Sequence, residues 1–256
     1  DVTASTVDPD AGALKGIAIT GVNNSNGQWQ YTLDGSTWVN VGVVAPTSAL
    51  LLPSDATTRV RFVPNADFNG VAGPFSVVSW DQTTGAAGTL ADASVGGGSS
   101  AFSAGGVSVS VTVIAVNDAP VASGSAALVA IAEATSAPPG ATVSGLFGAN
   151  FSDATDQVSG GSSANNFGGI AIVANSANDT QGKWRWYNGS SWVDVGTSVS
   201  TSSALLLSSS TLLRFEPGAN FSGTPGSLTV RLVDDSSGAV TSGSVVNLTS
   251  SGGTTR

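Results

Sequence analysis

The stretch of sequence that decides the fold is GQWQYTLDGSTWVNVG, residues 27–42, which returns as GKWRWYNGSSWVDVG, residues 182–196. In both copies, apolar and polar residues alternate on either side of a turn pair, Asp-Gly in the first copy and Asn-Gly in the second. Alternation at period two indicates a β-strand, and these turn pairs favour a hairpin because both positions tolerate positive φ. Each copy therefore predicts an antiparallel hairpin.

The repetition extends along most of the chain, and Gly16 returns as Gly169, 153 residues later. The matching segments are GIAI at 16–19 and 169–172, SALLL at 48–52 and 203–207, and RFVPNADFNG at 61–70 with RFEPGANFSG at 214–223. A period of this length is a whole domain rather than one turn of a solenoid. We therefore expect at least two related units in tandem.

Short alternating segments bounded by Gly, Asn, Asp and Pro predict the strands of both units. In the first unit we expect strands at 15–20, 28–33, 37–41, 59–63, 75–80 and 107–116. In the second we expect them at 127–132, 169–174, 183–187, 191–195, 211–216, 227–233 and 244–249. No segment shows helical periodicity, and the two SALLL segments are expected to be short turns at most. About seven short strands per unit favour an all-β fold of immunoglobulin-like antiparallel β-sandwiches.

The expected boundary between the units lies where the strand 107–116 ends in Asn117–Pro120, because proline stops strand pairing. We therefore expect one β-sandwich repeat over residues 1–116 and a second over residues 117–256.

Composition excludes several classes of function. The net charge is -9, with 15 Asp, 2 Glu and only 8 basic residues, so no clustered basic surface is available for nucleic acid. The chain has no His and no Cys, which excludes a Ser-His-Asp triad, a thiol nucleophile and a histidine metal site. A glycosidase carboxylate pair stays arithmetically possible, but neither Glu recurs in the other unit. We expect no enzymatic activity, and no apolar run is long enough for a membrane span.

Paired tryptophans leave two interpretations open. Trp29 and Trp184 recur in the first strand of each hairpin, and Trp38 and Trp192 recur across it. They could form a platform for a carbohydrate-binding module, which is the alternative function. The favoured interpretation is a cross-strand cluster in the core, where aromatic side chains bury the most area. Solvent quenching of tryptophan fluorescence would discriminate the two.

Acidic turns recur at matching positions. Asp8 and Asp10 precede the first GIAI strand, and Asp153 and Asp156 precede the second. Further acidic residues follow equivalent strands or lie in the linker, namely Asp81, Asp234, Asp235, Asn117 and Asp118. Ca²⁺ takes six to eight oxygen ligands, which clustered Asp-rich turns can supply. The alternative is that Asp and Asn simply suit turns.

The linker Val116-Asn117-Asp118-Ala119-Pro120-Val121, the Gly-x-Trp-x-aromatic hairpins, the Arg-Phe-x-Pro segments and Trp80-Asp81 resemble the cadherin-like repeats of giant bacterial surface proteins, the RTX-type and VCBS-type adhesins. The resemblance covers nearly the whole chain. It implies two tandem immunoglobulin/cadherin-like antiparallel β-sandwich domains at the cell surface, with Ca²⁺ stiffening the joints. It also implies a structural or adhesive role toward another surface or a glycan.

The same resemblance implies which residues bind Ca²⁺. At the joint between the two units it assigns the ligands Asp81, Asn117, Asp118, Asp153 and Asp156. At the following joint it assigns Glu133, Asp234 and Asp235. Asp8 and Asp10 are the matching acidic turn ahead of the first unit.

The two units differ in how they open. The second has the apolar segment 127–132, whereas the first has only Val2–Val7, with Ser and Thr between its two valines. A sandwich without an edge strand exposes unpaired backbone groups that another chain can pair with. We therefore expect the first unit to be completed by a neighbouring repeat or protomer, in a head-to-tail filament. The alternative is that Val2–Val7 itself serves as a poor first strand.

Overall fold

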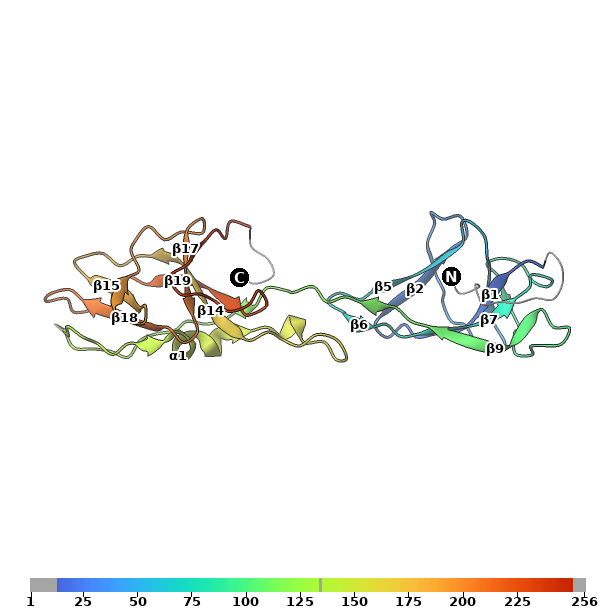
Figure 1. Ribbon diagram of the computed structural model, residues 1–256, viewed down its shortest axis with the longest axis horizontal. Coiled ribbons are helices and arrows are strands. Elements are labelled where there is room, and N and C mark those ends of the chain that lie inside the picture. Colours follow the sequence, from blue (N-terminus) through green and yellow to red (C-terminus); the bar gives the residue numbers. More distant parts are fainter. Residues whose placement is uncertain (1–12, 134, 251–256) are drawn as a thin grey trace. The chain divides into compact units, whose positions relative to one another are not determined.

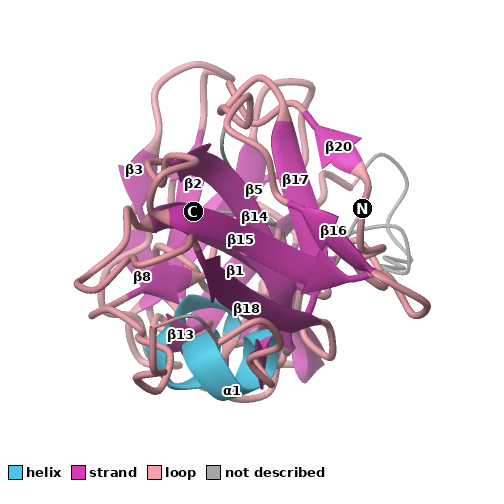
Figure 2. Cartoon of the chain, turned by 90° about the vertical axis from the view of Figure 1, so that its left-hand side faces the viewer, coloured by secondary structure: helices cyan, strands magenta, loops and turns pink. Residues whose placement is uncertain are grey.

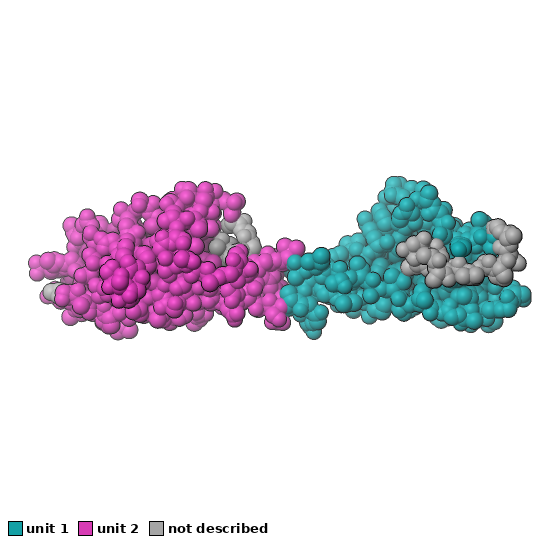
Figure 3. All heavy atoms as spheres, in the orientation of Figure 1, with its two compact units in different colours: residues 1–115, 158–162 teal, residues 116–157, 163–256 magenta. Residues whose placement is uncertain are grey.

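The computed structural model describes residues 13–133 and 135–250. Strands make up most of the regular structure, and the single α-helix among these residues is short (Figure 2). The chain divides into two compact units, Asp1–Ala115 with Val158–Ser162 and Val116–Gln157 with Ser163–Arg256 (Figure 3). The expected all-β, antiparallel character with a β-sandwich arrangement is confirmed.

The first unit contains two main antiparallel sheets (Figure 1). The larger has the order β8-β4-β1-β7-β9, formed by β8 (Leu90–Ala91), β4 (Ala49–Pro53), β1 (Gly16–Val22), β7 (Phe75–Trp80) and β9 (Phe102–Val109). The smaller has the order β3-β2-β5, formed by β3 (Val39–Asn40), β2 (Gly27–Thr32) and β5 (Arg59–Pro64). A further pair joins β10 (Thr112–Val113) to β6 (Gly70–Val71).

The second unit repeats this plan with one strand fewer in one sheet and one more in the other. One sheet has the order β19-β14-β17-β20, formed by β19 (Leu228–Asp234), β14 (Phe167–Asn175), β17 (Ala204–Ser208) and β20 (Val245–Val246). The other has the order β12-β18-β15-β16, formed by β12 (Ala141–Thr142), β18 (Leu212–Pro217), β15 (Gly182–Tyr187) and β16 (Trp192–Asp194). The remaining elements are β11 (Val121–Ala122), β13 (Phe151–Ser152), helix α1 (Val143–Phe147) and the 3₁₀ turns η1 (Gly148–Asn150) and η2 (Ala154–Asp156).

The pairing registers show that the β2–β5 pair of the first unit is equivalent to the β15–β18 pair of the second. Trp29 of β2 lies opposite Phe62 of β5, as Trp184 of β15 lies opposite Phe215 of β18. Two residues further along each strand, Tyr31 lies opposite Val60, and Trp186 lies opposite Leu213. The hairpin stretch and the RF segment therefore pair with each other in both units, as their joint recurrence in the sequence requires.

Each unit buries a core between its two sheets. In the first unit the larger sheet contributes Ile17, Ile19 and Leu52, and the smaller sheet contributes Trp29. In the second unit the corresponding cluster is formed by Ile170, Ile172, Leu207, Trp186 and Leu213, with Val143 added from α1. Burial of these apolar side chains is the main stabilising contribution of each sandwich.

The SALLL segments are strands, so the expectation of short turns was wrong. Leu50 and Leu52 of β4 point into the core between the sheets, whereas Leu51 joins a second buried cluster with Trp80 and Phe102. Because this strand is buried on both faces, its sequence is a continuous apolar run without period-two alternation. The second buried face of β4 is covered by residues distant in sequence, among them Ala93 and Ala101. Local periodicity therefore does not reveal it.

The predicted strand 127–132 is also wrong, since these residues are not in a strand and Val129 is 89% exposed. The edge strand that pairs with β18 is instead β12, followed directly by α1. Thr142 caps this helix, because its side chain accepts a hydrogen bond from the backbone N–H of Gly145 (3.0 Å). The element lies in a Pro-, Gly- and Ser-rich stretch, where neither strand nor helix periodicity is visible.

Candidate functional site

The second unit gathers the acidic turns at one end of its β14–β19 pair. Asp234 is the last residue of β19 and lies opposite Phe167, the first residue of β14. Asp153 immediately precedes η2, and Asp156 is its last residue. The linker runs to the same end of the unit, and the side chain of its Pro120 is fully buried.

Hydrogen bonds tie the linker to η2. The backbone N–H of Asp118 donates to the carboxylate of Asp156, at 3.0 Å from Oδ1 and 3.3 Å from Oδ2. Asn165 connects the remaining parts, because its side-chain amide donates to Asn117 Oδ1 (2.7 Å) and to Asp156 Oδ2 (3.1 Å). Its backbone N–H donates to Asp153 Oδ2 (2.5 Å). The linker, η2 and the start of β14 therefore form one polar network, which we call the linker network.

Three carboxylates of this region are buried: Asp153 and Asp156 are each 5% exposed, and Asp234 is 0% exposed. Asp153 Oδ1 and Asp234 Oδ2 have no hydrogen-bond partner among the described residues. The other oxygen of Asp234 accepts from the backbone N–H of Ser236 (2.9 Å) and from its hydroxyl. Buried carboxylate oxygens without a partner are costly, because the charge is removed from water without compensation.

The electrostatics of Asp153 reflect this burial. Loss of solvent raises the pKa of its carboxyl above the usual range, and the negative charges of Asp156 and Asp234 raise it further. The hydrogen bond from the Asn165 backbone opposes the rise only partly. The structure records no ion pair that joins Asp153 or Asp234 to a lysine or arginine of the described residues. This end of the second unit therefore holds several buried carboxylates close together.

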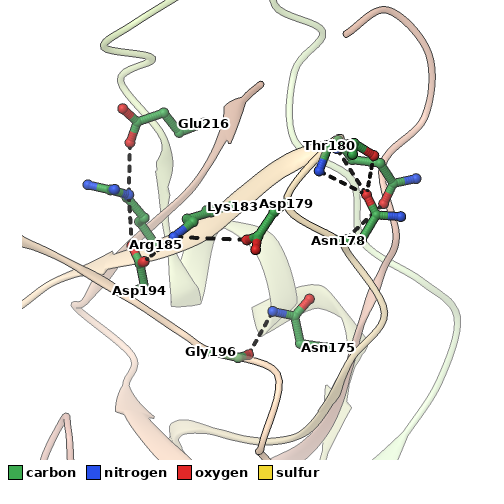
Figure 4. Close-up of polar contacts among 10 residues, drawn as sticks. Asn175, Asn178, Asp179, Thr180, Lys183, Arg185, Asp194, Gly196 and Glu216 are labelled. Atoms are coloured by element: carbon green, nitrogen blue, oxygen red, sulfur yellow. Dashed lines mark hydrogen bonds and ion pairs between the residues drawn. The ribbon is translucent and has the colours of Figure 1, made fainter. Parts of the chain in front are cut away.

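Three basic side chains of the described part of this unit, Lys183, Arg185 and Arg214, form ion pairs away from the linker network. On the outer face of β15, Arg185 lies between Asp194 and Glu216, at 2.9 and 3.0 Å, and Lys183 contacts Asp194 at 3.0 Å (Figure 4). This cross-strand ladder joins β16, β15 and β18. It pairs Lys183 and Arg185 with the acidic residues of β16 and β18.

The donor set formed by the linker network and the neighbouring Asp234 suits a hard cation. Carboxylate and amide oxygens are the ligands that Ca²⁺ prefers, and two carboxylate oxygens here are both buried and without hydrogen bonds. Among residues 13–133 and 135–250, no three acidic side chains are already drawn together tightly enough to enclose an ion. Binding would therefore require the carboxylates of Asp153, Asp156 and Asp234 to converge, which their mutual repulsion opposes until a cation is present.

The resemblance also assigned residues outside the linker network. Asp81 follows β7 in the first unit and accepts from the backbone N–H and hydroxyl of Thr83 (2.8 and 2.6 Å). This turn matches the one that Asp234 forms with Ser236, so Asp81 is the counterpart of Asp234. Glu133 is exposed in a turn, not at the end of a strand. Asp8 and Asp10 lie outside the described residues.

Asp234 lies opposite Phe167, and its negative charge acts on Asp153 at the same end of the second unit. Asp235 lies beside it and accepts two hydrogen bonds from Asn166, through the backbone N–H (2.8 Å) and the side-chain amide (3.0 Å). Sequence reasoning missed both Asn165 and Asn166. Their signal was an Asn-Asn pair directly ahead of the GIAI strand, within a stretch otherwise rich in Gly and Ser.

The four paired tryptophans are in contact with other side chains. Trp29 and Trp184 donate their indole N–H groups to the carbonyls of Gly73 and Gly226, both at 2.8 Å. Trp29 is 4% exposed, and Trp184 is half-buried against the core. The guanidinium of Arg61 stacks on Trp38, and that of Arg214 stacks on Trp192, each 4.0 Å from the ring centroid.

The chain matches no protein-family model, and neither a curated protein nor a solved structure is significantly similar to it. Within the described part of the chain, no helix has the length and apolar character needed to cross a membrane. The architecture is that of an all-β protein with several antiparallel sheets.

Proposed function

We propose that this chain is a non-catalytic structural and adhesive repeat module of an extracellular bacterial surface protein. Its two units are immunoglobulin/cadherin-like sandwiches, and the linker network binds Ca²⁺. The observation that carries this proposal is the pair of buried oxygens without partners, Asp153 Oδ1 and Asp234 Oδ2. Whole-domain repetition supports the structural role, because arrays of domains provide reach and multivalency.

The residues around these oxygens explain how an ion would act. Bound Ca²⁺ would supply positive charge beside Asp153 and Asp234, each of which has a buried oxygen without a hydrogen-bond partner among the described residues. Asp153 and Asp234 would offer it their free oxygens, and Asp156 already holds the backbone of Asp118. Asn165 positions the loop by its bonds to Asn117 and Asp156. Ion binding would therefore stiffen the start of the unit by fixing the linker to η2 and β19.

Hydrogen exchange monitored by mass spectrometry tests this role locally. With Ca²⁺ in place of a chelator, we expect slower exchange at the amides of Asp118 and Asn165, because both donate to carboxylates that the ion would hold in place. The β2–β3 hairpin of the first unit is the internal control and should exchange at the same rate. Equal exchange at the linker in both conditions, or an equal change in the control hairpin, would count against the proposal.

A further inference from the structure

The hairpin turn of the second unit carries an asparagine followed by a glycine. Asn188 and Gly189 lie between β15 and β16, and both residues are exposed. Gly189 has a φ of 98°, in the region of backbone conformation that favours glycine. Because glycine has no Cβ atom, its backbone nitrogen can approach the side-chain carbonyl carbon of the preceding asparagine. This approach is the first step by which an asparagine loses ammonia.

The turn surrounds the side-chain oxygen of Asn188 with hydrogen-bond donors. The backbone N–H groups of Ser190 and Ser191 donate to Oδ1 at 3.0 and 2.9 Å, and the hydroxyl of Ser190 donates to it at 3.0 Å. Fixed donors of this kind stabilise the negative charge that a carbonyl oxygen gains when a nucleophile adds to its carbon. Neither the backbone N–H of Gly189 nor the side-chain nitrogen of Asn188 donates a hydrogen bond to a described residue. The attacking and the leaving nitrogen are therefore both available.

A second turn of the same unit has the donors but not the glycine. The side-chain oxygen of Asn178 accepts from the backbone N–H groups of Thr180 and Gln181, both at 3.1 Å, and from the hydroxyl of Thr180 at 2.6 Å (Figure 4). The next residue is Asp179, whose side chain hinders an approach by its own backbone nitrogen. Asn178 is therefore an internal reference for the contribution of the glycine.

Two other asparagines have the glycine but not the surroundings. The chain also contains Asn26-Gly27 and Asn69-Gly70. Asn69 is only 6% exposed, and the side-chain oxygen of Asn26 accepts no hydrogen bond from a described residue. Among the described asparagines, Asn188 alone combines exposure, donors to its side-chain oxygen and a following glycine.

The first unit has an aspartate at the position of Asn188. Asp34 precedes Gly35 in that hairpin, and its Oδ1 accepts from the backbone N–H groups of Thr37 and Ser36 at 2.7 and 2.8 Å. The hydrogen bond from Thr37, followed by that from Ser36, holds the pKa of the Asp34 carboxyl well below its usual range. The same donors therefore favour a carboxylate over a neutral group at this place in the turn.

We propose that Asn188 deamidates spontaneously through a cyclic imide formed with Gly189. The backbone nitrogen of Gly189 gives its proton to hydroxide and bonds to Cγ of Asn188. The bond from Cγ to the side-chain nitrogen breaks, and this nitrogen takes up a proton from water and leaves as ammonia. A second water opens the imide at either carbonyl and leaves an aspartate or an isoaspartate. The hairpin tip gains one negative charge, as in the first unit, and the reaction does not depend on the calcium site.

Peptide mapping by mass spectrometry tests the proposal on the full chain, incubated at about pH 8 so that hydroxide is available as the base. Deamidation adds about 1 Da to the peptide that carries it. In the folded chain we expect Asn188 to convert at least about tenfold faster than Asn26, Asn69 or Asn178. In denaturant the three Asn-Gly pairs should convert at similar rates, because the turn no longer holds its donors in place. Equal rates at the three pairs in the folded chain would overturn the proposal.

Variants at Asp179 test the chemistry at the reference turn. Asp179→Gly places a glycine after Asn178 within the same set of donors, at a side chain that is 92% exposed. We expect conversion of Asn178 to become at least about tenfold faster, while Asn188 is unaffected. Asp179→Ala is the matched control, because it removes the same carboxylate but keeps a Cβ atom, and circular dichroism checks that both variants fold. Equal conversion of Asn178 in the two variants, or the same lead of Asn188 in denaturant as in the folded chain, would overturn the proposal.

Discussion

Replacement of Trp29 by alanine is expected to lower the free energy of unfolding of the first unit by about 3–5 kcal/mol. The indole is 4% exposed and contacts Phe75 and Phe62, with ring centroids 4.5 and 5.2 Å away. The change would leave a cavity between the sheets and would also remove the hydrogen bond to the carbonyl of Gly73. Denaturant unfolding followed by circular dichroism measures the loss.

Trp38→Ala is the matched control for Trp29→Ala. Trp38 is only half-buried, and its main contact is the stacked guanidinium of Arg61, so we expect a loss of about 1 kcal/mol or less. Similar losses for the two variants would contradict the assignment of Trp29 to the core. The pair also bears on the carbohydrate alternative, which requires that Trp29 bind sugar without supporting the fold.

Asp153→Asn is expected to change stability in opposite directions with and without Ca²⁺. In chelator at neutral pH the variant should be more stable than the original chain, because it removes a buried charge whose folded-state pKa is raised. With Ca²⁺ at one hundred times its dissociation constant, ion binding would stabilise the original chain by about 2.7 kcal/mol. The variant should lose most of this stabilisation and therefore be less stable than the original chain. Thermal melts in both conditions measure the reversal.

The pH dependence of this effect has a definite sign. A carboxyl group whose pKa is raised by folding stabilises the protein below its unfolded-state pKa, and this contribution is lost as the pH rises through the folded-state pKa. In chelator, the advantage of Asp153→Asn should therefore grow from about pH 4 upward. Asp179→Asn makes the same charge change at a side chain that is 92% exposed, and it should show no such dependence. The same pH dependence of stability in both variants would contradict a raised pKa at Asp153.

The sequence predicted the repeated hairpin and its partner strand because their signals are local. Trp29 and Tyr31 alternate with polar residues, and the RF segments alternate in the same way, so period two marks the face that each strand buries. The SALLL strand was not recognised because both of its faces are buried. The segment 141–147 was not recognised because its role is set by an edge far away in sequence, that of β18.

The acidic residues of this region could be picked out from the sequence, but their grouping could not. Asp-rich turns led us to predict a cation site, and the structure brings Asn117, Asp118, Asp153 and Asp156 into one hydrogen-bonded network. The position of Asp234 within the same unit follows from the pairing of β19 with β14, which no local pattern reveals. Asn165 was missed for the same reason, because its role depends on hydrogen bonds to three residues that are distant in sequence.

Isothermal titration of Ca²⁺ into the full chain and into Asp234→Asn tests whether the buried carboxylates bind the ion. We expect saturable binding to the original chain and a binding event that is lost or at least about tenfold weaker in the variant, which lacks one charged oxygen ligand. Asp179→Asn should bind as the original chain does. Absence of binding to the original chain, or identical binding to Asp234→Asn, would contradict the claim that these buried carboxylates form a calcium site.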